Sequence, residues 1–176
     1  MTCRKCDIDL TQSTKNHPKG VLHPLILCVV VVFLFVIIGG RGYKSTVKQY
    51  LSASLDADAK EMISLMPKEY ISYGIKTGVI TSKRELIADT KEVAEASKKE
   101  RDISYGKGWK YDYKITNIYR YDAEELDMYK YYNDYIESAK AAMEVDVELT
   151  IEDVETFDMT LLLLKIGSKW YVADMS

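Results

Sequence analysis

Two cysteines and two histidines near the N-terminus have the types and spacing of metal ligands. Cys3 and Cys6 are separated by two residues, a spacing at which two thiolates bind one face of a tetrahedral zinc ion. A closed structural site needs four ligands. His17 and His23 would supply the other two, although the proline that follows each histidine disfavours a ligand-bearing helix. Two chains could instead share one zinc through Cys3 and Cys6, forming a homodimer through this tail, or the pair could bind no metal.

The first ten residues, MTCRKCDIDL, resemble the start of the short zinc ribbons that open many bacterial membrane proteins. Met1, Cys3, Cys6 and Leu10 stand in matching places. The sequence departs from that pattern at Asp7, where glycine usually follows the second cysteine, and it has no second CxxC pair. The resemblance therefore implies a zinc site that is complete only when two chains combine, or a remnant of such a site.

One acidic residue, Asp112, lies between Tyr111 and Tyr113 and could take part in proton transfer. A carboxyl group or a phenol transfers protons at neutral pH when burial adjusts its pKa. Adjacent residues of a strand point to opposite faces, so Asp112 leaves any cavity that Tyr111 enters. All three cysteines and both histidines lie at or before Cys28, which excludes a Cys nucleophile, a His base or a His-ligated metal in the rest of the chain. We therefore expect no catalytic residues.

The charge of the chain argues against nucleic acid as a partner. From residue 41 onward, 20 lysines and arginines stand against 25 aspartates and glutamates, a formal charge of −5. No basic patch is visible in the sequence of this part. Proteins that bind nucleic acid gain most of their affinity from such patches.

A long apolar run follows the cysteine-containing N-terminal residues. Residues 21–40 read VLHPLILCVVVVFLFVIIGG and contain no Asp, Glu, Lys or Arg. About 20 helical residues cross a bilayer core of about 30 Å. We therefore expect a transmembrane helix at residues 21–40. The alternatives are a cleaved secretory signal, which lacks a small-residue cleavage pattern here, and a buried soluble helix.

The orientation of this helix does not follow from charge. The two flanks carry equal numbers of basic residues, which are Arg4, Lys5, Lys15 and Lys19 before the run and Arg41, Lys44, Lys48 and Lys60 after it. Long domains are exported largely regardless of charge, and a reduced CxxC pair suits the cytosol. We expect residues 1–20 to form a short cytoplasmic tail of a single-pass protein of the cell membrane. Residues 41–176 then form an extracytoplasmic domain.

Two helical regions are expected at the start of this domain. Apolar residues recur at helical spacing over residues 47–66, where Asp56 or Asp58 can cap a second helix and Pro67 ends it. The region is therefore one broken helix or two short ones. Ser82 and Glu85 form a capping-box pattern that predicts a second region reaching towards Lys99.

Strands are expected in the second half of the domain. Aromatic and β-branched residues alternate with polar ones over residues 109–116, and Val145, Val147, Leu149 and Ile151 share one face of the next strand. Residues 157–175 read as a hairpin that turns at Gly167 and Ser168. The four leucines at 161–164 indicate a strand that is covered on both sides.

A helical excursion is expected at residues 122–142, between the first two strands. Its tyrosines lie all around such a helix, so they cannot all be buried. Tyrosine combines apolar area with a hydrogen-bond donor and is common at protein contacts. The protein-contact candidates are therefore Tyr129, Tyr131, Tyr132 and Tyr135. The alternative is an ordinary half-buried helix.

Helices followed by an antiparallel sheet are the order of an α+β fold. The closing hairpin, KIGSKWYVADM, resembles that of nuclear transport factor 2-like (cystatin-like) extracytoplasmic domains of Gram-positive bacteria. The resemblance covers residues 43–176, and the excursion after Asp122 is similar to one in a subgroup of small membrane-bound proteins. It implies a cone in which a curved sheet wraps the helices around a cavity. The ligand-pocket candidates on the concave face are Trp109, Tyr111, Tyr113 and Trp170, unless these residues only pack in the core.

Three functions are compatible with these features. The first is a non-catalytic module that binds a small ligand, a peptide or an envelope protein. The second is an assembly subunit of a secretion, conjugation or sporulation complex in the membrane. The third is an enzyme, because the resembling family includes isomerases that use Asp and Tyr. We favour the first, and we expect no cofactor other than the zinc considered for Cys3 and Cys6.

Overall fold

The computed structural model describes residues 42–175. The predictions for Cys3, Cys6, His17 and His23, and for the span 21–40, lie outside the described residues. Within the described part, none of the helices combines the length and the apolar character needed to span a membrane.

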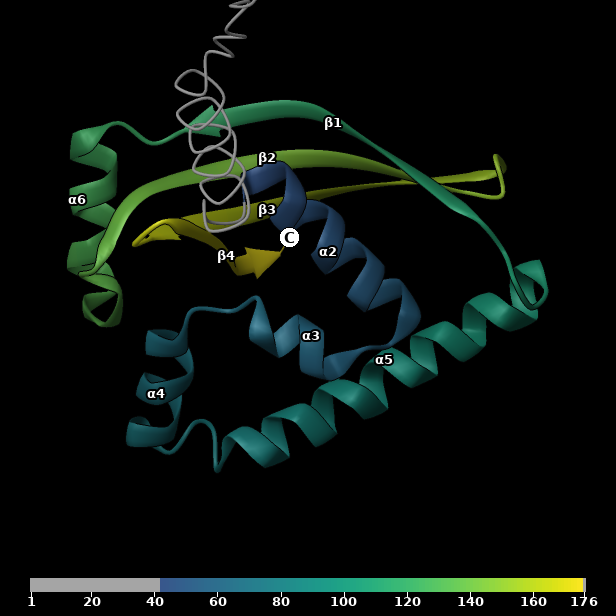
Figure 1. Ribbon diagram of the computed structural model, residues 1–176, viewed down its shortest axis with the longest axis horizontal. Coiled ribbons are helices and arrows are strands. Elements are labelled where there is room, and N and C mark those ends of the chain that lie inside the picture. Colours follow the sequence, from purple (N-terminus) through teal and green to yellow (C-terminus); the bar gives the residue numbers. More distant parts are fainter. Residues whose placement is uncertain (1–41, 176) are drawn as a thin grey trace, which may run out of the picture. The chain divides into compact units, whose positions relative to one another are not determined.

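In the described residues, four α-helices come first and are followed by a four-stranded sheet (Figure 1). The helices of the first half are α2 (Tyr43–Asp56), α3 (Ala59–Ser64), α4 (Lys68–Thr77) and α5 (Lys83–Tyr105). The second half contains β1 (Tyr111–Arg120), α6 (Ala123–Tyr132), the 3-10 turn η1 (Asp134–Ile136), β2 (Ala139–Ile151), β3 (Glu155–Ile166) and β4 (Lys169–Met175). The strands are antiparallel and lie in the order β1-β2-β3-β4. The predicted α+β class is confirmed.

The first predicted helical region forms two helices. Ala57 adopts a left-handed conformation (φ 61°) and ends α2, and the Asp58 side chain accepts a hydrogen bond from the Glu61 backbone N at 3.0 Å to begin α3. The predicted second cap is therefore confirmed at Asp58. Pro67 does follow α3, but it also precedes α4, a helix that the sequence pattern did not predict.

The long helix α5 begins where predicted and ends later. The Ser82 side chain accepts from the Glu85 backbone N at 3.1 Å, and the helix continues past Lys99 to Tyr105. Gly106, at φ 87°, is the first residue after the helix and has a conformation that favours glycine. Of the 23 residues in α5, only Ala94 is buried, so most of the helix surface faces solvent.

The main core lies between α2 and one face of the sheet. Val145, Val147, Leu149 and Ile151 are all buried, as their alternation predicts. The cluster combines residues of α2, β2, β3 and β4 with Leu65, and its members are Val47, Tyr50, Leu51, Leu65, Met143, Val145, Val147, Leu161, Leu163 and Val172. Figure 1 shows α2 beginning beside the sheet and running obliquely towards α5. A backbone hydrogen bond of 2.8 Å from the Val172 N to the Leu65 O ties the end of α3 to β4.

A second, smaller core covers the opposite face at one end of the sheet. It consists of Leu126, Ile136, Ala139, Ala142 and Leu164. Because Leu163 belongs to the main core and Leu164 to the second one, β3 is covered on both sides here, as the leucine run predicts.

The predicted excursion is shorter than expected. Residues 139–142 were included in its helical pattern, but they form the start of β2. Ala139 and Ala142 are each 2 % exposed and pack beneath α6 and η1. Their small side chains allow this close approach, and the pairing with β3 outweighs the helical propensity of alanine.

Candidate functional site

A cleft of about 460 Å³ lies where three helices meet the last strand. Its lining comes from α2 and α3 (Ser54, Met62), from α5 (Asp89, Thr90, Val93, Ala94, Ser97, Arg101) and from the end of β4 (Met175). Most of the lining is apolar. Cavities of this size accommodate small organic ligands.

Helix α5 forms one wall of the cleft along its length. Thr90, Val93, Ala94, Ser97 and Arg101 recur every three or four residues and therefore share one face of the helix. Arg101 lies 12 positions after Asp89, which corresponds to about 18 Å along the helix at 1.5 Å per residue. The cleft is thus elongated, with a carboxylate at one end of this wall and a guanidinium at the other.

Arg101 is a half-buried cation at its end of the cleft. Its Nε and Nη2 atoms are buried and have no hydrogen-bond partner. Burial lowers the pKa of Arg101, while Asp102 and Glu100 act in the opposite direction. No ion pair joins Arg101 to any carboxylate within the described part of the chain.

The Trp109 ring holds the Arg101 side chain. The Arg101 Cζ lies 5.4 Å from the ring centre, a distance typical of a cation–π contact. The Trp109 Nε1 donates to the Asp102 Oδ1 at 3.0 Å. Trp109, a candidate for the ligand pocket, does not line this cleft. It instead supports Arg101, which does.

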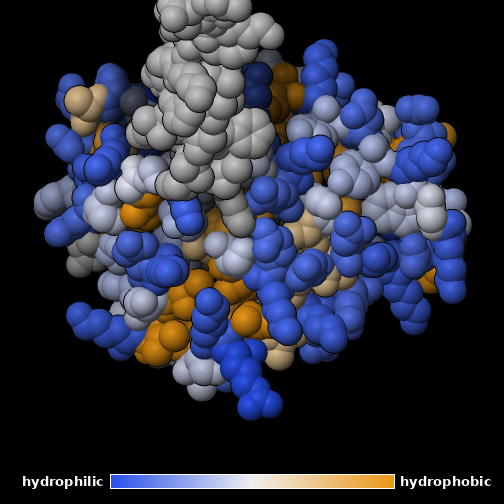
Figure 2. Space-filling model, viewed as in Figure 1, coloured by the Kyte–Doolittle hydropathy of each residue, from blue (hydrophilic) through white to orange (hydrophobic). Residues whose placement is uncertain are grey.

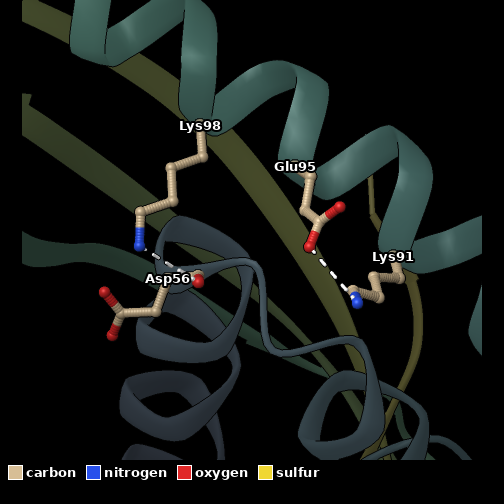
Figure 3. Close-up of polar contacts among 4 residues, drawn as sticks. All are labelled: Asp56, Lys91, Glu95 and Lys98. Atoms are coloured by element: carbon tan, nitrogen blue, oxygen red, sulfur yellow. Dashed lines mark hydrogen bonds and ion pairs between the residues drawn. The ribbon is translucent and has the colours of Figure 1, made fainter.

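Two lysines of α5 are engaged elsewhere (Figure 3). The Lys98 Nζ donates to the Asp56 O at the end of α2, at 3.3 Å, which ties α5 to α2. The Lys91 Nζ lies 3.5 Å from the Glu95 Oε1, and both side chains are well exposed to solvent. Neither lysine lines the cleft.

The other three pocket candidates do not meet in one cavity. Tyr111 lies 6.4 Å from Trp109 and lines a shallow pocket of about 160 Å³ near the turn between β2 and β3. Tyr113 and Trp170 are half-buried and pack against the main core. Tyr111 is on β1 and Trp170 on β4, the two edges of the sheet.

Asp112 points away from the core, as alternation along β1 predicts. It is exposed, whereas Tyr111 and Tyr113 on either side are half-buried. Its Oδ1 accepts from the Tyr113 backbone N at 2.8 Å. The only carboxylate in the lining of the cleft is Asp89, which is itself exposed.

The four contact candidates around α6 divide into two pairs. Tyr129 and Tyr135 are half-buried and pack against the second core. The Tyr135 ring also lies 5.7 Å from that of Tyr70 and 4.8 Å from that of Tyr73, which joins η1 to α4.

Tyr131 and Tyr132 face solvent instead. They are 81 % and 75 % exposed and form an edge-to-face pair at 5.3 Å. The two residues are therefore available to a partner, while Tyr129 and Tyr135 stabilise the fold.

The tyrosines of the second core predict a loss of stability in alkali. Burial raises the pKa of Tyr121 from 10.0 to about 12, helped by the hydrogen bond from its hydroxyl to Glu144. Burial also raises the pKa of Tyr129 to about 12, helped by Tyr135 and Asp174. Because these hydroxyls ionise more readily in the unfolded chain, their contribution is complete below pH 10 and is lost as pH rises towards 12.

Urea unfolding at a series of pH values measures this effect. The free energy of unfolding should stay level up to about pH 9 and fall above about pH 10. In the double variant Tyr121→Phe, Tyr129→Phe the fall should be smaller, although not absent, because burial also raises the pKa of Tyr50. An identical fall in both proteins would contradict the assignment.

Sequence reasoning missed the cleft because its walls come from distant segments. Residues 47–66 and the region from Ser82 towards Lys99 were predicted only as helices, with no cavity between them. A usable signal was the adjacent apolar pair Val93 and Ala94 in the highly charged middle of helix α5.

The chain was compared with known proteins at the level of families, sequences and structures. Family models, curated proteins and solved structures give no match to the chain. Among the described residues, His, Cys, Asp and Glu side chains do not gather in any group of three or more that could hold a metal ion.

Proposed function

We propose that this chain is a single-pass protein of a Gram-positive cell membrane whose extracytoplasmic domain binds a ligand without catalysis. The domain is proposed to be of the nuclear transport factor 2-like (cystatin-like) type, with residues 21–40 as the anchor and the N-terminus in the cytoplasm. The order of helices followed by an antiparallel sheet supports this type, as does the closing hairpin at Gly167.

The cleft beside α5 is the observation that carries the proposal. Val93 is 68 % exposed and Met175 49 % exposed, although both line a mostly apolar hollow. Each Å² of apolar surface removed from water contributes about 25 cal/mol. A ligand that covers these side chains therefore gains affinity from surface that the domain itself leaves open.

The surface of the domain is largely hydrophilic on the face seen in Figure 2. Figure 2 shows one face of the molecule on which hydrophilic residues predominate and hydrophobic residues gather in a patch.

A non-catalytic role fits the placement of the acids. Asp112 lies on the face of β1 that turns away from the core, and Asp89 is solvated. General acid–base catalysis at neutral pH favours a buried carboxyl with a raised pKa. The isomerase alternative therefore has no support from the geometry of either residue.

Thermal unfolding of the full chain in lipid nanodiscs tests ligand binding. A library of amphiphiles and peptides should contain a compound that stabilises the domain, by about 2.7 kcal/mol when its free concentration is 100 times Kd. In Val93→Trp the larger side chain should fill the cleft and weaken binding about tenfold or more. Ile103→Trp is the matched control, because Ile103 is on α5, is 74 % exposed and does not line the cleft.

Two outcomes would oppose the proposal. Melting that no compound in the library changes would remove the case for a ligand. Equal weakening in Val93→Trp and Ile103→Trp would place the binding surface outside the cleft.

An assembly role is the second candidate, and the exposed tyrosine pair favours it. Aromatic side chains are enriched where partners bind, and Met128, which is 53 % exposed, lies on the same helix. Replacing both Tyr131 and Tyr132 with alanine should then abolish recovery of membrane partners by pull-down after crosslinking in cells. Tyr119→Ala, at another exposed tyrosine, is the control. Undiminished recovery from the double variant would oppose this role.

A further inference from the structure

We propose that the cleft takes a single-chain amphiphile with one anionic head group, and that Arg101 binds that head group. This inference rests on the proposed ligand-binding function and specifies the chemical class of the ligand.

The charge at one end of the cleft determines the head group. Arg101 lines the cleft, and its buried nitrogens have no hydrogen-bond partner. A buried donor without a partner destabilises a protein, and an acceptor that pairs with it restores the lost interaction. Anionic oxygens form the strongest such bonds with guanidinium.

The contact with Trp109 prepares Arg101 for this role. The indole ring lies within cation–π distance of the guanidinium, and its own Nε1 donates to Asp102. An arginine held in this way loses little conformational entropy when an anion binds.

The remaining lining suits a hydrocarbon tail. Apart from Asp89 and Arg101, the lining combines four apolar side chains with three hydroxyls, and most of its surface is apolar; the apolar residues are Met62, Val93, Ala94 and Met175, and the hydroxyls belong to Ser54, Thr90 and Ser97. Methionine is flexible and adapts its shape to irregular apolar ligands. The Tyr50 hydroxyl donates to the Met175 sulfur at 3.9 Å, a contact that helps to hold this lining side chain in place.

The far end of the cleft limits the ligand to one anionic group. Asp89 stands about 18 Å from Arg101 along α5 and disfavours a second anion there. A polyphosphate would need several cations, whereas Lys91 and Lys98 are turned to other partners. A cationic head group would meet the like charge of Arg101. An amphiphile with one carboxylate or one phosphate places no second anion near Asp89, needs no further cation and carries no positive charge towards Arg101.

Photo-crosslinking of the full chain in lipid nanodiscs tests the inference. The probes are dodecanoate, dodecyl phosphate, dodecanol and dodecylamine, each with a diazirine at the end of the chain, and labelled peptides are identified by mass spectrometry. We expect dodecanoate or dodecyl phosphate to label peptides that contain Met62, Val93 or Met175 more strongly than the other two probes. Which of the two anions labels better distinguishes a fatty acid from a phosphate-bearing lipid.

Two arginine variants then assign the head group to Arg101. Arg101→Met keeps the apolar stem, and it should lower anionic labelling about tenfold while leaving dodecanol labelling within about twofold. Arg101→Lys should retain part of the anionic labelling. Arg84→Met, at an exposed arginine on the same helix, should change neither. A merely structural role of Arg101 would lower the labelling by anionic and neutral probes alike, which would overturn the assignment.

The probe series on the unchanged chain decides the matter even if Arg101→Met fails to fold. Equal labelling of the cleft by all four probes would overturn the anionic head group and leave the proposed function intact. Absence of cleft labelling by every probe would overturn the amphiphile, whereas a peptide of the thermal-unfolding library that stabilises the domain would leave the proposed function intact.

Discussion

Replacing Leu163 with alanine is expected to lower the free energy of unfolding by about 2–5 kcal/mol. Leu163 is 0 % exposed in the centre of β3 and belongs to the main core. It pairs with Met143 on β2 and with Val172 on β4, so its side chain lies between both neighbouring strands and α2. The loss is large because the rigid sheet cannot collapse into the cavity that the smaller side chain leaves.

Leu162→Ala is the matched control for this prediction. Leu162 is the adjacent residue of the same strand, but it points to the other face and lines an open surface hollow with Glu144 and Asp174. Urea unfolding of both variants should show a loss at least about 1 kcal/mol greater for Leu163→Ala. Equal losses would mean that the main core is not centred on this face of β3.

Replacing Ile136 with alanine is expected to cost a similar amount, about 2–5 kcal/mol, but in a different part of the domain. Ile136 is 0 % exposed in η1 and packs in the second core with Leu126 and Leu164. This small core fixes α6 and η1 to the sheet. Its truncation should therefore raise the hydrogen exchange of α6 more than that of the central strands.

Hydrogen exchange and urea unfolding together measure the effect of Ile136→Ala. Met128→Ala, at an exposed position on α6, should change the free energy of unfolding by less than about 0.5 kcal/mol. If exchange rose equally in α6 and in β2, the second core would have to be part of one cooperative unit with the main core.

The sequence predicted the sheet well because its patterns are local. The alternation over Val145, Val147 and Leu149 specifies which face of β2 is buried, whatever covers that face. Gly167, at φ 62°, marks the predicted turn between β3 and β4. Likewise the cap residues Asp58 and Ser82 act on backbone groups three residues away and could be recognised without tertiary information.

The features that were missed depend on distant contacts. Helix α4 contains Gly74 and several residues of low helix propensity, and Tyr70 and Tyr73 meet Tyr135 about 60 residues later in the chain. The alanines at the start of β2 read as helical because alanine favours helices, whereas in the fold they provide space beneath α6.

The candidate site shows the same limit. Trp109 was identified as an aromatic residue beside a cavity, but its partners, Arg101 and Asp102, belong to the preceding helix. The cleft itself joins four segments between Ser54 and Met175, and no local pattern specifies which of their side chains share a surface. A pocket formed by tertiary packing can therefore be identified only from the structure.

The central claim is that the cleft beside α5 is the ligand site, and methionine-methyl NMR tests it most directly. The full chain, labelled with methyl-¹³C methionine and held in lipid nanodiscs, is titrated with dodecanoate. The methyl signals of Met62 and Met175, which line the cleft, should shift, while that of Met128, exposed on α6, should stay in place. Shifts confined to Met128, or no shift at a dodecanoate concentration that saturates the nanodisc, would contradict the account.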